Sequence, residues 1–441
     1  MKVLFSNPPW WHVDGDRLMS GVRAGSRWPF LQAANARPDE FKFGNYLPFP
    51  FFMAYAASYA TANTSASIML RDSIALGEGY EAYLAFLAAE RPEMVVIESA
   101  SPSWEHDQKV IIEIHRLLGP DVKIVVTGPI TTIKSAEILA TLPVVACIKG
   151  EYEKGVVKVI NGTTGTLDHD LLSVAEMNAA PPPYMDGKTS HRYFDYNPIG
   201  QTYPHAHVWS SRGCPYKCVF CVWPATMTGN DPDGTSPRTV RHYTAEYMEE
   251  YLQWLSRDYG FKSIYFDDDT FNLGNAHVLR MCAVMRKIGL PWSAMCRADT
   301  SKMETWQVMK DSGCFGVKIG FESGSQYVVD KIVNKHLDLE YARDVVHELK
   351  RIGMSVHGTF TVGLPGETHE QMRETLAYIE SLPLDTHQLS GTAEIEGTPL
   401  HTLRSAGKLA KYEGATMDAD APVHSDGVRR WGEIAEELRN T

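Results

Sequence analysis

Short runs rich in β-branched residues alternate with longer helical patterns along most of the chain, and this alternation limits the folds that it can adopt. In the first part of the sequence, strands are predicted at 2–6, 66–70, 94–99, 122–127 and 144–149. Helices are predicted between and after them, near 49–62, 79–90, 105–118, 134–141 and 152–160. Strands joined by crossover helices form a parallel sheet that is covered on both faces. We therefore expect an α/β, doubly wound, Rossmann-like domain over residues 1–160.

The alternation resumes after a stretch with the composition of a linker, residues 161–204, which contains three consecutive prolines. Further strands are predicted near 206–210, 262–267, 292–297, 315–321, 355–361 and 387–393. All but the last are followed by a helical pattern. Six βα units do not complete an eight-fold barrel, so we expect a partial (β/α)6 TIM barrel over residues 205–400, with its site at the carboxyl ends of the strands. Residues 401–441 are expected to form a polar C-terminal tail.

The composition excludes some classes of function. At 441 residues, the chain is too long for one hydrophobic core, which agrees with two domains. The formal net charge of −12 argues against a nucleic-acid partner, because neutralising phosphates requires a basic face. No apolar run approaches the roughly 18 residues that a membrane span needs, and the apolar start is too short for a signal peptide. We therefore expect a cytoplasmic protein with no membrane partner.

Three cysteines stand close together at Cys214, Cys218 and Cys221, with the spacing C-x-x-x-C-x-x-C. They follow the first predicted barrel strand, so they are expected on a loop at the carboxyl face of the barrel. Cysteine thiolates at short spacings hold iron–sulfur clusters, and three thiolates leave one iron of a four-iron cluster open. A structural zinc site usually takes four ligands in paired knuckles, and no second pair follows. We favour an iron–sulfur cluster, with a zinc-stabilised binding protein and chance clustering as the alternatives.

With Phe220 beside the third cysteine, this loop resembles the signature loop of the radical S-adenosylmethionine (SAM) superfamily. Further motifs follow in order on the predicted strands: YFDDDTF (265–271), CRAD (296–299), GFESGS (320–325), GLPGET (363–368) and EGTPL (396–400). The resemblance covers residues 205–400. The preceding sheet is similar to the cobalamin-binding (B12-binding) type of domain found in one branch of that superfamily.

The resemblance implies two cofactors, a 4Fe-4S cluster and SAM, whose amino and carboxylate groups would chelate the open iron. One electron from the reduced cluster would cleave the sulfonium C–S bond, giving methionine and a 5′-deoxyadenosyl radical that abstracts hydrogen from the substrate. The chemistry implies an electron donor such as a flavodoxin or ferredoxin, and a separate reductase if a radical product must be quenched. The substrate is expected to be a polar small molecule.

Several polar residues at the ends of predicted strands are expected to bind SAM. At least one of Asp268 and Asp269 would accept a hydrogen bond from the methionyl ammonium, although a helix cap also explains Asp269. Arg297 offers a fork for the methionyl carboxylate, with a salt bridge at the barrel rim as the alternative. Glu322 and Ser323 are expected to bind the ribose hydroxyls or the carboxylate of SAM.

The adenine of SAM is expected to meet less polar residues. Phe220 could stack on it or shield the cluster. The tight turn formed by Gly363, Leu364 and Pro365 is expected to lie against it, with a plain turn between a strand and a helix as the alternative.

Three polar residues on the last two predicted strands are candidates for catalysis. Strand alternation puts Glu394 and Glu396 on one face, and His357 lies on the strand before. If that face points inward, these residues could act as acid or base. The alternative is that they face solvent at strand ends.

Two enzyme reactions are compatible with this resemblance. The cobalamin motif D-x-H-x-x-G does not occur, and the loop VTGPIT carries a single glycine where a pair is common, although many members of the branch lack the motif. We therefore favour a radical SAM lyase that dehydrates or rearranges a polar, aminoglycoside-type natural-product intermediate, similar to the radical SAM diol dehydratases, with a cofactor-free N-terminal sheet. The alternative is a methyltransferase in which methylcobalamin, bound between the domains, supplies a methyl group to the substrate radical.

Overall fold

The computed structural model describes residues 1–408 apart from 15–16, 21–29, 34–45, 365 and 393. The chain divides into two compact units, an N-terminal unit (1–194 with 226–230) and a C-terminal unit (195–225 with 231–441). The expected C-terminal tail lies outside the described residues from position 409 onward.

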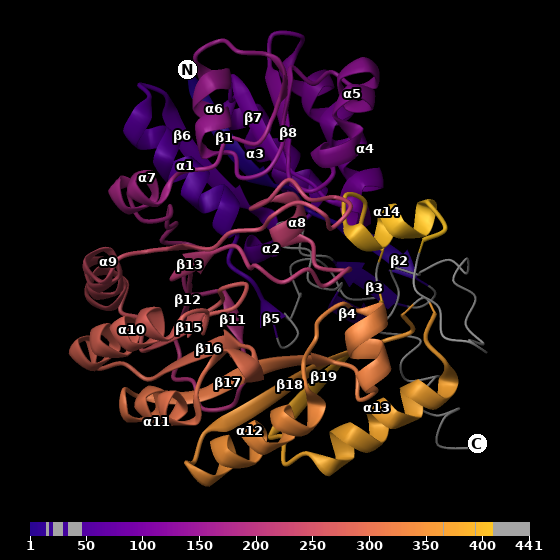
Figure 1. Cartoon of the computed structure of the whole chain (residues 1–441). Helices are drawn as coiled ribbons and strands as arrows, with labels where there is room; N and C mark the ends of the chain where they lie inside the picture. Colours follow the sequence, from indigo (N-terminus) through magenta and orange to yellow (C-terminus); the bar gives the residue numbers. More distant parts are fainter. Residues whose placement is uncertain (15–16, 21–29, 34–45, 365, 393, 409–441) are drawn as a thin grey trace. The chain divides into compact units, whose positions relative to one another are not determined.

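The N-terminal unit is built on a six-stranded parallel sheet with the order β10-β9-β8-β7-β1-β6 (Figure 1). Its strands are β1 (Lys2–Asn7), β6 (Ser67–Asp72), β7 (Met94–Glu98), β8 (Lys123–Thr127), β9 (Ala146–Ile148) and β10 (Gly165–Leu167). The first strand lies between the next two along the chain, so the strand order reverses between β1 and β7. Ligands of doubly wound sheets bind at this switch point.

Two layers of helices cover this sheet, as the nearly continuous apolar runs of β7 and β8 require. Leu4, Val95 and Ile124 join a core with side chains of α3, α4 and α5. On the other face, α1 packs against α6. The helices are α1 (Phe51–Asn63), α2 (Ser73–Leu76), α3 (Tyr80–Glu90), α4 (Ser101–Leu118), α5 (Thr131–Thr141), α6 (Glu153–Ile160) and α7 (Val174–Ala179). The expected Rossmann-like sheet is confirmed.

Shorter elements complete the N-terminal part of the chain. Strands β2 (Trp11–Asp14), β3 (Arg17–Ser20) and β4 (Phe30–Ala33) form a small antiparallel sheet. Two further strands, β5 (Tyr46–Leu47) and β11 (Phe194–Asp195), have two residues each. Residues 161–194, which we expected within a linker, carry β10 and α7 and belong to the N-terminal unit.

The C-terminal unit is an open, six-stranded parallel half-barrel whose strands follow their order along the chain (Figure 1). They are β12 (His205–Val208), β15 (Ser263–Phe266), β16 (Trp292–Cys296), β17 (Cys314–Glu322), β18 (Ser355–Val362) and β19 (Thr386–Gly391). The helices between and after them are α9 (Ala245–Asp258), α10 (Asn275–Ile288), α11 (Met303–Asp311), α12 (Leu339–Arg351), α13 (His369–Ser381) and α14 (Pro399–Ser405). The predicted partial barrel is confirmed.

Five short elements lie in the loops of the barrel segment. They are β13 (Ser211–Arg212) and β14 (Arg241–His242), which pair antiparallel, α8 (Trp223–Thr226), the 3-10 helix η2 (Ala298–Thr300) and the π-helix η3 (Val328–Ile332). No helix among the described residues is long and apolar enough to cross a bilayer.

The two faces of the half-barrel differ in polarity, and the pairing register shows how. One row of paired residues is apolar: Phe266, Ala294, Val317 and Val356. The next row, which faces the other way, is Met295, Lys318, His357 and Thr386. The apolar face carries the helices, since Phe321 meets the ring of Tyr378 on α13. The polar face is therefore the inner face of the half-barrel.

Candidate functional site

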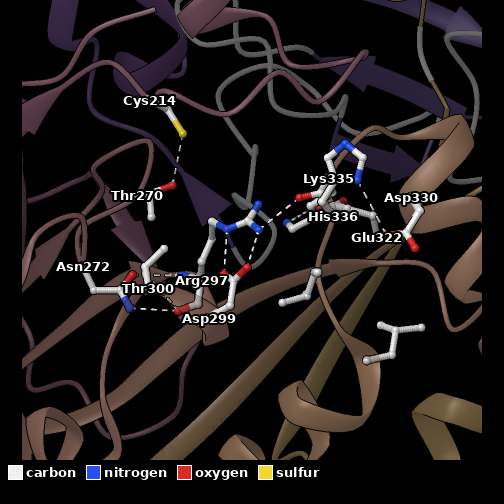
Figure 2. Close-up of polar contacts among 12 residues, drawn as sticks. Cys214, Thr270, Asn272, Arg297, Asp299, Thr300, Glu322, Asp330, Lys335 and His336 are labelled. Carbon is white, nitrogen blue, oxygen red and sulfur yellow. Dashed lines mark hydrogen bonds and ion pairs between the residues drawn. The ribbon is translucent and has the colours of Figure 1, made fainter.

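The cysteine loop (residues 213–222) leaves the barrel directly after β13. Its first residue, Gly213, has a φ of +91° and donates its N–H to Asp269 Oδ2 at 3.1 Å. The next residue, Cys214, places its Sγ 3.5 Å from Thr270 Oγ1 (Figure 2). Because Asp269 and Thr270 come shortly after β15, the cysteines lie at the carboxyl ends of the barrel strands, as expected.

Of the three thiols of this loop, Cys214 is buried and Cys218 and Cys221 are half-buried, and the thiols influence one another. Burial raises the pKa of the Cys214 thiol to about 11, and the carboxylate of Asp269 acts in the same direction. Burial likewise raises the pKa of Cys221, to which Asp269 and then the thiols of Cys218 and Cys214 add. Because charge interactions weaken with distance, the three thiols must lie close together.

The donor set of this loop suits an iron–sulfur cluster. Its three thiols come from one short segment, and in a four-iron cluster each thiolate binds a different iron. The three cysteines thus fit a 4Fe-4S cluster with one iron left open.

The neighbouring aspartates, Asp268 and Asp269, differ in role. Asp268 is buried and accepts hydrogen bonds from Ser210 N at 3.1 Å, Ser210 Oγ at 2.9 Å and Ser211 Oγ at 2.5 Å. Burial raises its pKa to about 7 against these hydrogen bonds. Asp268 therefore ties the end of β12 to the end of β15, whereas Asp269 supports the cysteine loop.

Arg297, expected to bind the methionyl carboxylate, is bound by a carboxylate of the chain itself (Figure 2). Its guanidinium makes two hydrogen bonds to Asp299, at 2.9 and 2.7 Å, and a third to the carbonyl of Lys335 at 3.1 Å. It also lies 3.7 Å from the ring centroid of Tyr216 in the cysteine loop. Arg297 thus connects β16, the cysteine loop and the segment after η3.

Glu322 ends β17 in the left-handed region, with a φ of +71°, an unusual conformation for a residue with a side chain. Its carboxylate pairs with Lys335 at 2.8 Å (Figure 2). It also accepts a hydrogen bond from Thr361 Oγ1 at 3.3 Å. Lys335, Glu322 and Arg297 all act on the pKa of Cys218, which burial raises. The structure therefore brings Glu322 and Arg297 together beside the cysteines.

Ser323, by contrast, faces a helix. Its Oγ lies 2.9 Å from Thr375 Oγ1 on α13, which also accepts the N–H of Gly324 at 2.9 Å. Gly324 is in tight contact with the same helix, since an added Cβ would lie 2.5 Å from Tyr378 Cβ and 2.6 Å from Glu374 O. The absence of a side chain at Gly324 therefore permits the close approach of α13.

Substituting Gly324 by alanine is therefore expected to destabilise the protein by about 1–3 kcal/mol, the usual cost of overpacking a dense contact. The backbone of α13 must move to admit the methyl group. Urea denaturation measures the change. Gly187→Ala is the matched control, because nothing lies within 4 Å of a Cβ at that position. An equal, small effect of both substitutions contradicts the packing argument.

The turn after β18 brings an apolar residue to Phe220. Leu364 is buried in a cluster with Val328, Ile332 and Val333, and the side chains of Cys218 and Phe220 pack against this cluster. Gly363 has a φ of +72°, and its N–H and that of Leu364 both bond to Glu367 Oε2, at 2.9 and 3.1 Å. Pro365 lies outside the described residues.

The three residues expected to act in catalysis lie in different settings. His357 is buried on the inner face, 2.8 Å from Thr386 Oγ1, and burial lowers its pKa to about 3, which keeps it neutral. Strand β19 ends at Gly391, so Glu394 and Glu396 follow the strand and the expected alternation does not apply to them. Glu394 is engaged by His401 at 2.9 Å and Arg404 at 2.6 Å.

Sequence reasoning missed four residues beside the cysteines: Tyr216, Arg238, Asp299 and Lys335. Two lay within recognised motifs, since Tyr216 is inside the cysteine loop and Asp299 ends CRAD. Arg238 and Lys335 carried no signal, because both reach the site from loops that no strand pattern predicts.

Comparisons with known proteins agree with this site. A family model of the radical SAM superfamily matches residues 210–379. An uncharacterized methyltransferase, PH0819 of Pyrococcus horikoshii, is 25% identical over 376 residues, which cover 82% of this chain and 79% of that protein. Cytidylyl-2-hydroxyethylphosphonate methyltransferase of Streptomyces wedmorensis is 26% identical over 285 residues, covering 60% of this chain and 48% of that protein.

A solved structure shares the fold. It is the radical SAM methyltransferase TsrM of Kitasatospora setae, described with cobalamin and a 4Fe-4S cluster bound. The TM-score is 0.63 at 17% identity, and the match covers 82% of this chain and 76% of that one.

These relatives correct one prediction. Both curated relatives are methyltransferases, as is the cobalamin-dependent enzyme TokK of Streptomyces tokunonensis, which is 22% identical over 62% of this chain and 39% of its own length. The prediction of a lyase that dehydrates or rearranges its substrate, which we favoured from the sequence, is therefore wrong. The likeness to diol dehydratases has no support. The class of enzyme is confirmed: the chain contains a radical SAM domain over residues 210–379, with a 4Fe-4S cluster and SAM as its cofactors.

Proposed function

We propose that this chain is a cobalamin-dependent radical SAM methyltransferase that acts on a polar small molecule. The observation that carries the proposal is the likeness to a methyltransferase over 82% of the chain, which includes most of both units. When bound, the cluster and SAM supply a 5′-deoxyadenosyl radical, and methylcobalamin supplies a methyl group.

In this proposal the residues of the barrel hold and orient the cofactors. Cys214, Cys218 and Cys221 would hold the cluster and would leave one iron open to SAM. Asp269 and Glu322 are the carboxylates that flank the cysteines, and they are suited to accept from the methionyl ammonium. Arg297 can bind the methionyl carboxylate only if it gives up a contact with Asp299. Phe220 and Leu364 offer the apolar surface for adenine.

Two buried oxygens in the N-terminal unit support a ligand with amide groups, as the corrin side chains of cobalamin have. Asn7 Oδ1 and Glu98 Oε1 are buried without a hydrogen-bond partner among the described residues. Asn7 ends β1 and Glu98 ends β7, so both stand at the switch point of the sheet. A buried acceptor without a partner is costly, and a bound amide donor would relieve that cost.

The glycine of the loop after β8 gives no such support. A Cβ at Gly128 would lie 2.5 Å from Ser99 O and 2.9 Å from Glu98 Cγ. The space beside this glycine is therefore filled by the chain itself, which explains why one glycine is needed there. The acceptors at Asn7 and Glu98 remain the part of this edge that fits a cofactor.

A polar substrate is supported by the inner face of the half-barrel. Lys318, His357 and Thr386 form one row of that face, and Lys318 Nζ lies 4.7 Å from the ring centroid of Tyr265. Hydroxyl, imidazole and ammonium groups favour a substrate that returns hydrogen bonds. The one-electron chemistry calls for a reductant such as a flavodoxin or ferredoxin, and a separate reductase where a radical product must be quenched.

The proposal is tested with protein produced in the presence of cobalamin, purified without air and reconstituted with iron and sulfide. After incubation with SAM and a reductant, we expect retained corrin absorbance and two products, S-adenosylhomocysteine and 5′-deoxyadenosine. S-adenosylhomocysteine marks methyl transfer from SAM, and 5′-deoxyadenosine marks reductive cleavage. Protein that retains no corrin and forms only 5′-deoxyadenosine overturns the methyltransferase assignment.

The buried carboxyl of Glu98 leads to a prediction on pH. Burial raises its pKa from 4.5 to about 7 although it accepts a hydrogen bond from Tyr152. Between these values the unfolded chain has released the proton while the folded chain holds it, so stability falls as pH rises, by about 3 kcal/mol in all. Glu98→Gln removes this pH-dependent contribution to stability.

The free energy of unfolding of Glu98→Gln, taken relative to that of the wild type, should therefore be about 2–3 kcal/mol higher at pH 8 than at pH 5. Urea denaturation at both pH values measures the difference. Glu81→Gln, at an exposed position on α3, serves as the control for the loss of one carboxylate. A pH-independent effect of Glu98→Gln contradicts the prediction.

A further inference from the structure

One buried arginine beside the cysteine loop has no role in the account so far. Arg238 lies in the loop before β14, and its side chain is 1% exposed. Its Nε bonds to Asp231 Oδ2 at 2.7 Å, and its Nη1 bonds to the carbonyl oxygen of Tyr216 at 2.7 Å. Tyr216 stands between Cys214 and Cys218, so the guanidinium is fastened to the cysteine loop itself.

The third nitrogen of this guanidinium is not used. Arg238 Nη2 is buried and has no hydrogen-bond partner among the residues that the structure describes. Leaving a buried charged donor unpaired costs more than the roughly 1–3 kcal/mol of a neutral group. The carboxylate that binds Arg238 has a second partner, because Asp231 also accepts a hydrogen bond from the N–H of Ser236 at 2.7 Å. The site therefore presents a buried N–H donor, held in place by two hydrogen bonds of the same guanidinium, that calls for an acceptor.

The loop to which Arg238 is bonded through Tyr216 also carries acceptors, the sulfurs of Cys214, Cys218 and Cys221. Burial raises the pKa of both Cys218 and Cys221, and the charge of Arg238 acts on both thiols in the opposite direction. Two other cations, Lys335 and Arg297, also act on the pKa of Cys218, and each is paired with a carboxylate. Arg238 is paired too, with Asp231, but its Nη2 is in addition a buried donor without a partner among the described residues.

We propose that Arg238 donates a hydrogen bond from Nη2 to a sulfur of the bound iron–sulfur cluster and thereby makes the cluster easier to reduce. Hydrogen bonds to sulfur and nearby positive charge both favour the reduced, more negative cluster, and they are among the factors that set cluster potentials. Arg238 is then a positioning and tuning residue for the electron transfer that precedes SAM cleavage. The inference rests on the radical SAM domain and not on the methyltransferase proposal.

The test is a redox titration of the reconstituted, full-length protein, monitored by the electron paramagnetic resonance signal of the reduced cluster. Arg238→Lys keeps the charge and can keep the pair with Asp231, but it loses the Nη2 donor. We expect the reduced-to-oxidised ratio at a fixed potential to fall about tenfold, which for one electron is a shift of about 59 mV to lower potential. Arg238→Lys with wild-type iron content and an unchanged midpoint overturns the proposal.

Two further variants make the result specific. Asp231→Asn leaves the guanidinium in place but removes its counter-charge, so the midpoint potential of the cluster should rise. An unchanged or lower midpoint potential contradicts the proposal. This second variant keeps the test decisive if Arg238→Lys fails to load iron. Arg212→Lys is the matched control. Arg212 is another buried arginine next to the cysteine loop, but it bonds to Tyr243 OH at 3.1 and 2.9 Å. Its substitution should change the reduced-to-oxidised ratio at a fixed potential by no more than about twofold.

Discussion

Replacing Cys218 by alanine is expected to leave the anaerobically reconstituted protein without a stable 4Fe-4S cluster and to reduce 5′-deoxyadenosine formation by at least about 100-fold. The reason is the ligand count. Three thiolates hold three irons and leave one for SAM, whereas two thiolates leave two irons exposed to water and oxygen. Cys214→Ala and Cys221→Ala should behave in the same way, since the three thiols form one ligand set.

The control for these substitutions is another buried cysteine. Cys147 lies on β9 of the N-terminal unit, and burial raises its pKa to about 12, as expected for a thiol that serves as a small apolar side chain. Cys147→Ala should retain iron, cluster absorbance and SAM cleavage. Iron content and 5′-deoxyadenosine are measured for all four variants. Wild-type iron content in Cys218→Ala contradicts the assignment of this thiol.

The second large effect is expected at the inner face of the half-barrel, where Lys318 forms a buried ion pair with Asp195. Removing one partner of such a pair costs about 3–5 kcal/mol, because the other charge is left buried. Lys318→Met should therefore lower the melting temperature of this unit by about 10 °C. The loss should be smaller at pH 5 than at pH 8, since burial already raises the pKa of Asp195 and the loss of Lys318 raises it further.

The loss of stability in Lys318→Met depends on pH because Asp195 can be protonated. In Lys318→Met, the folded protein can take up a proton at this carboxyl at acid pH, which removes the unpaired charge, whereas at higher pH the charge must be buried. The double variant Asp195→Asn/Lys318→Met removes both charges and should recover most of the lost stability. Calorimetry at the two pH values measures all three proteins. A double variant as unstable as the single one contradicts the ion-pair explanation.

The order of strands and helices could be predicted from the sequence because local patterns encode it. The near-continuous apolar runs of β7 and β8 reflect burial on both faces, and the alternation around Lys318 and His357 reflects one polar face. The end of β19 was harder to predict. Thr392 is still buried and its N–H bonds back to Val362 O, so the pattern does not show that the strand stops at Gly391. Glu394 and Glu396 were therefore treated as strand residues.

The site could be predicted only in part, because motifs identify positions but not directions. Asp268 and Asp269 are adjacent, yet the first turns to Ser210 and Ser211 and the second to Gly213. That choice depends on how the chain turns after Phe266, which no residue pattern gives. The reaction was harder still. Because the cobalamin motif is missing, we favoured a lyase from the sequence. If buried acceptors such as Asn7 and Glu98 bind the cofactor, as we propose, no sequence motif would reveal them.

The central claim is that the three cysteines hold a four-iron cluster with one iron open to SAM. Mössbauer spectroscopy of protein reconstituted with iron-57, recorded with and without SAM, tests it most directly. We predict four irons per chain as one cluster, with one of the four changing its isomer shift when SAM is added while three stay the same. A cluster whose four irons are all unaffected by SAM, or iron that does not assemble into a four-iron cluster, contradicts the claim.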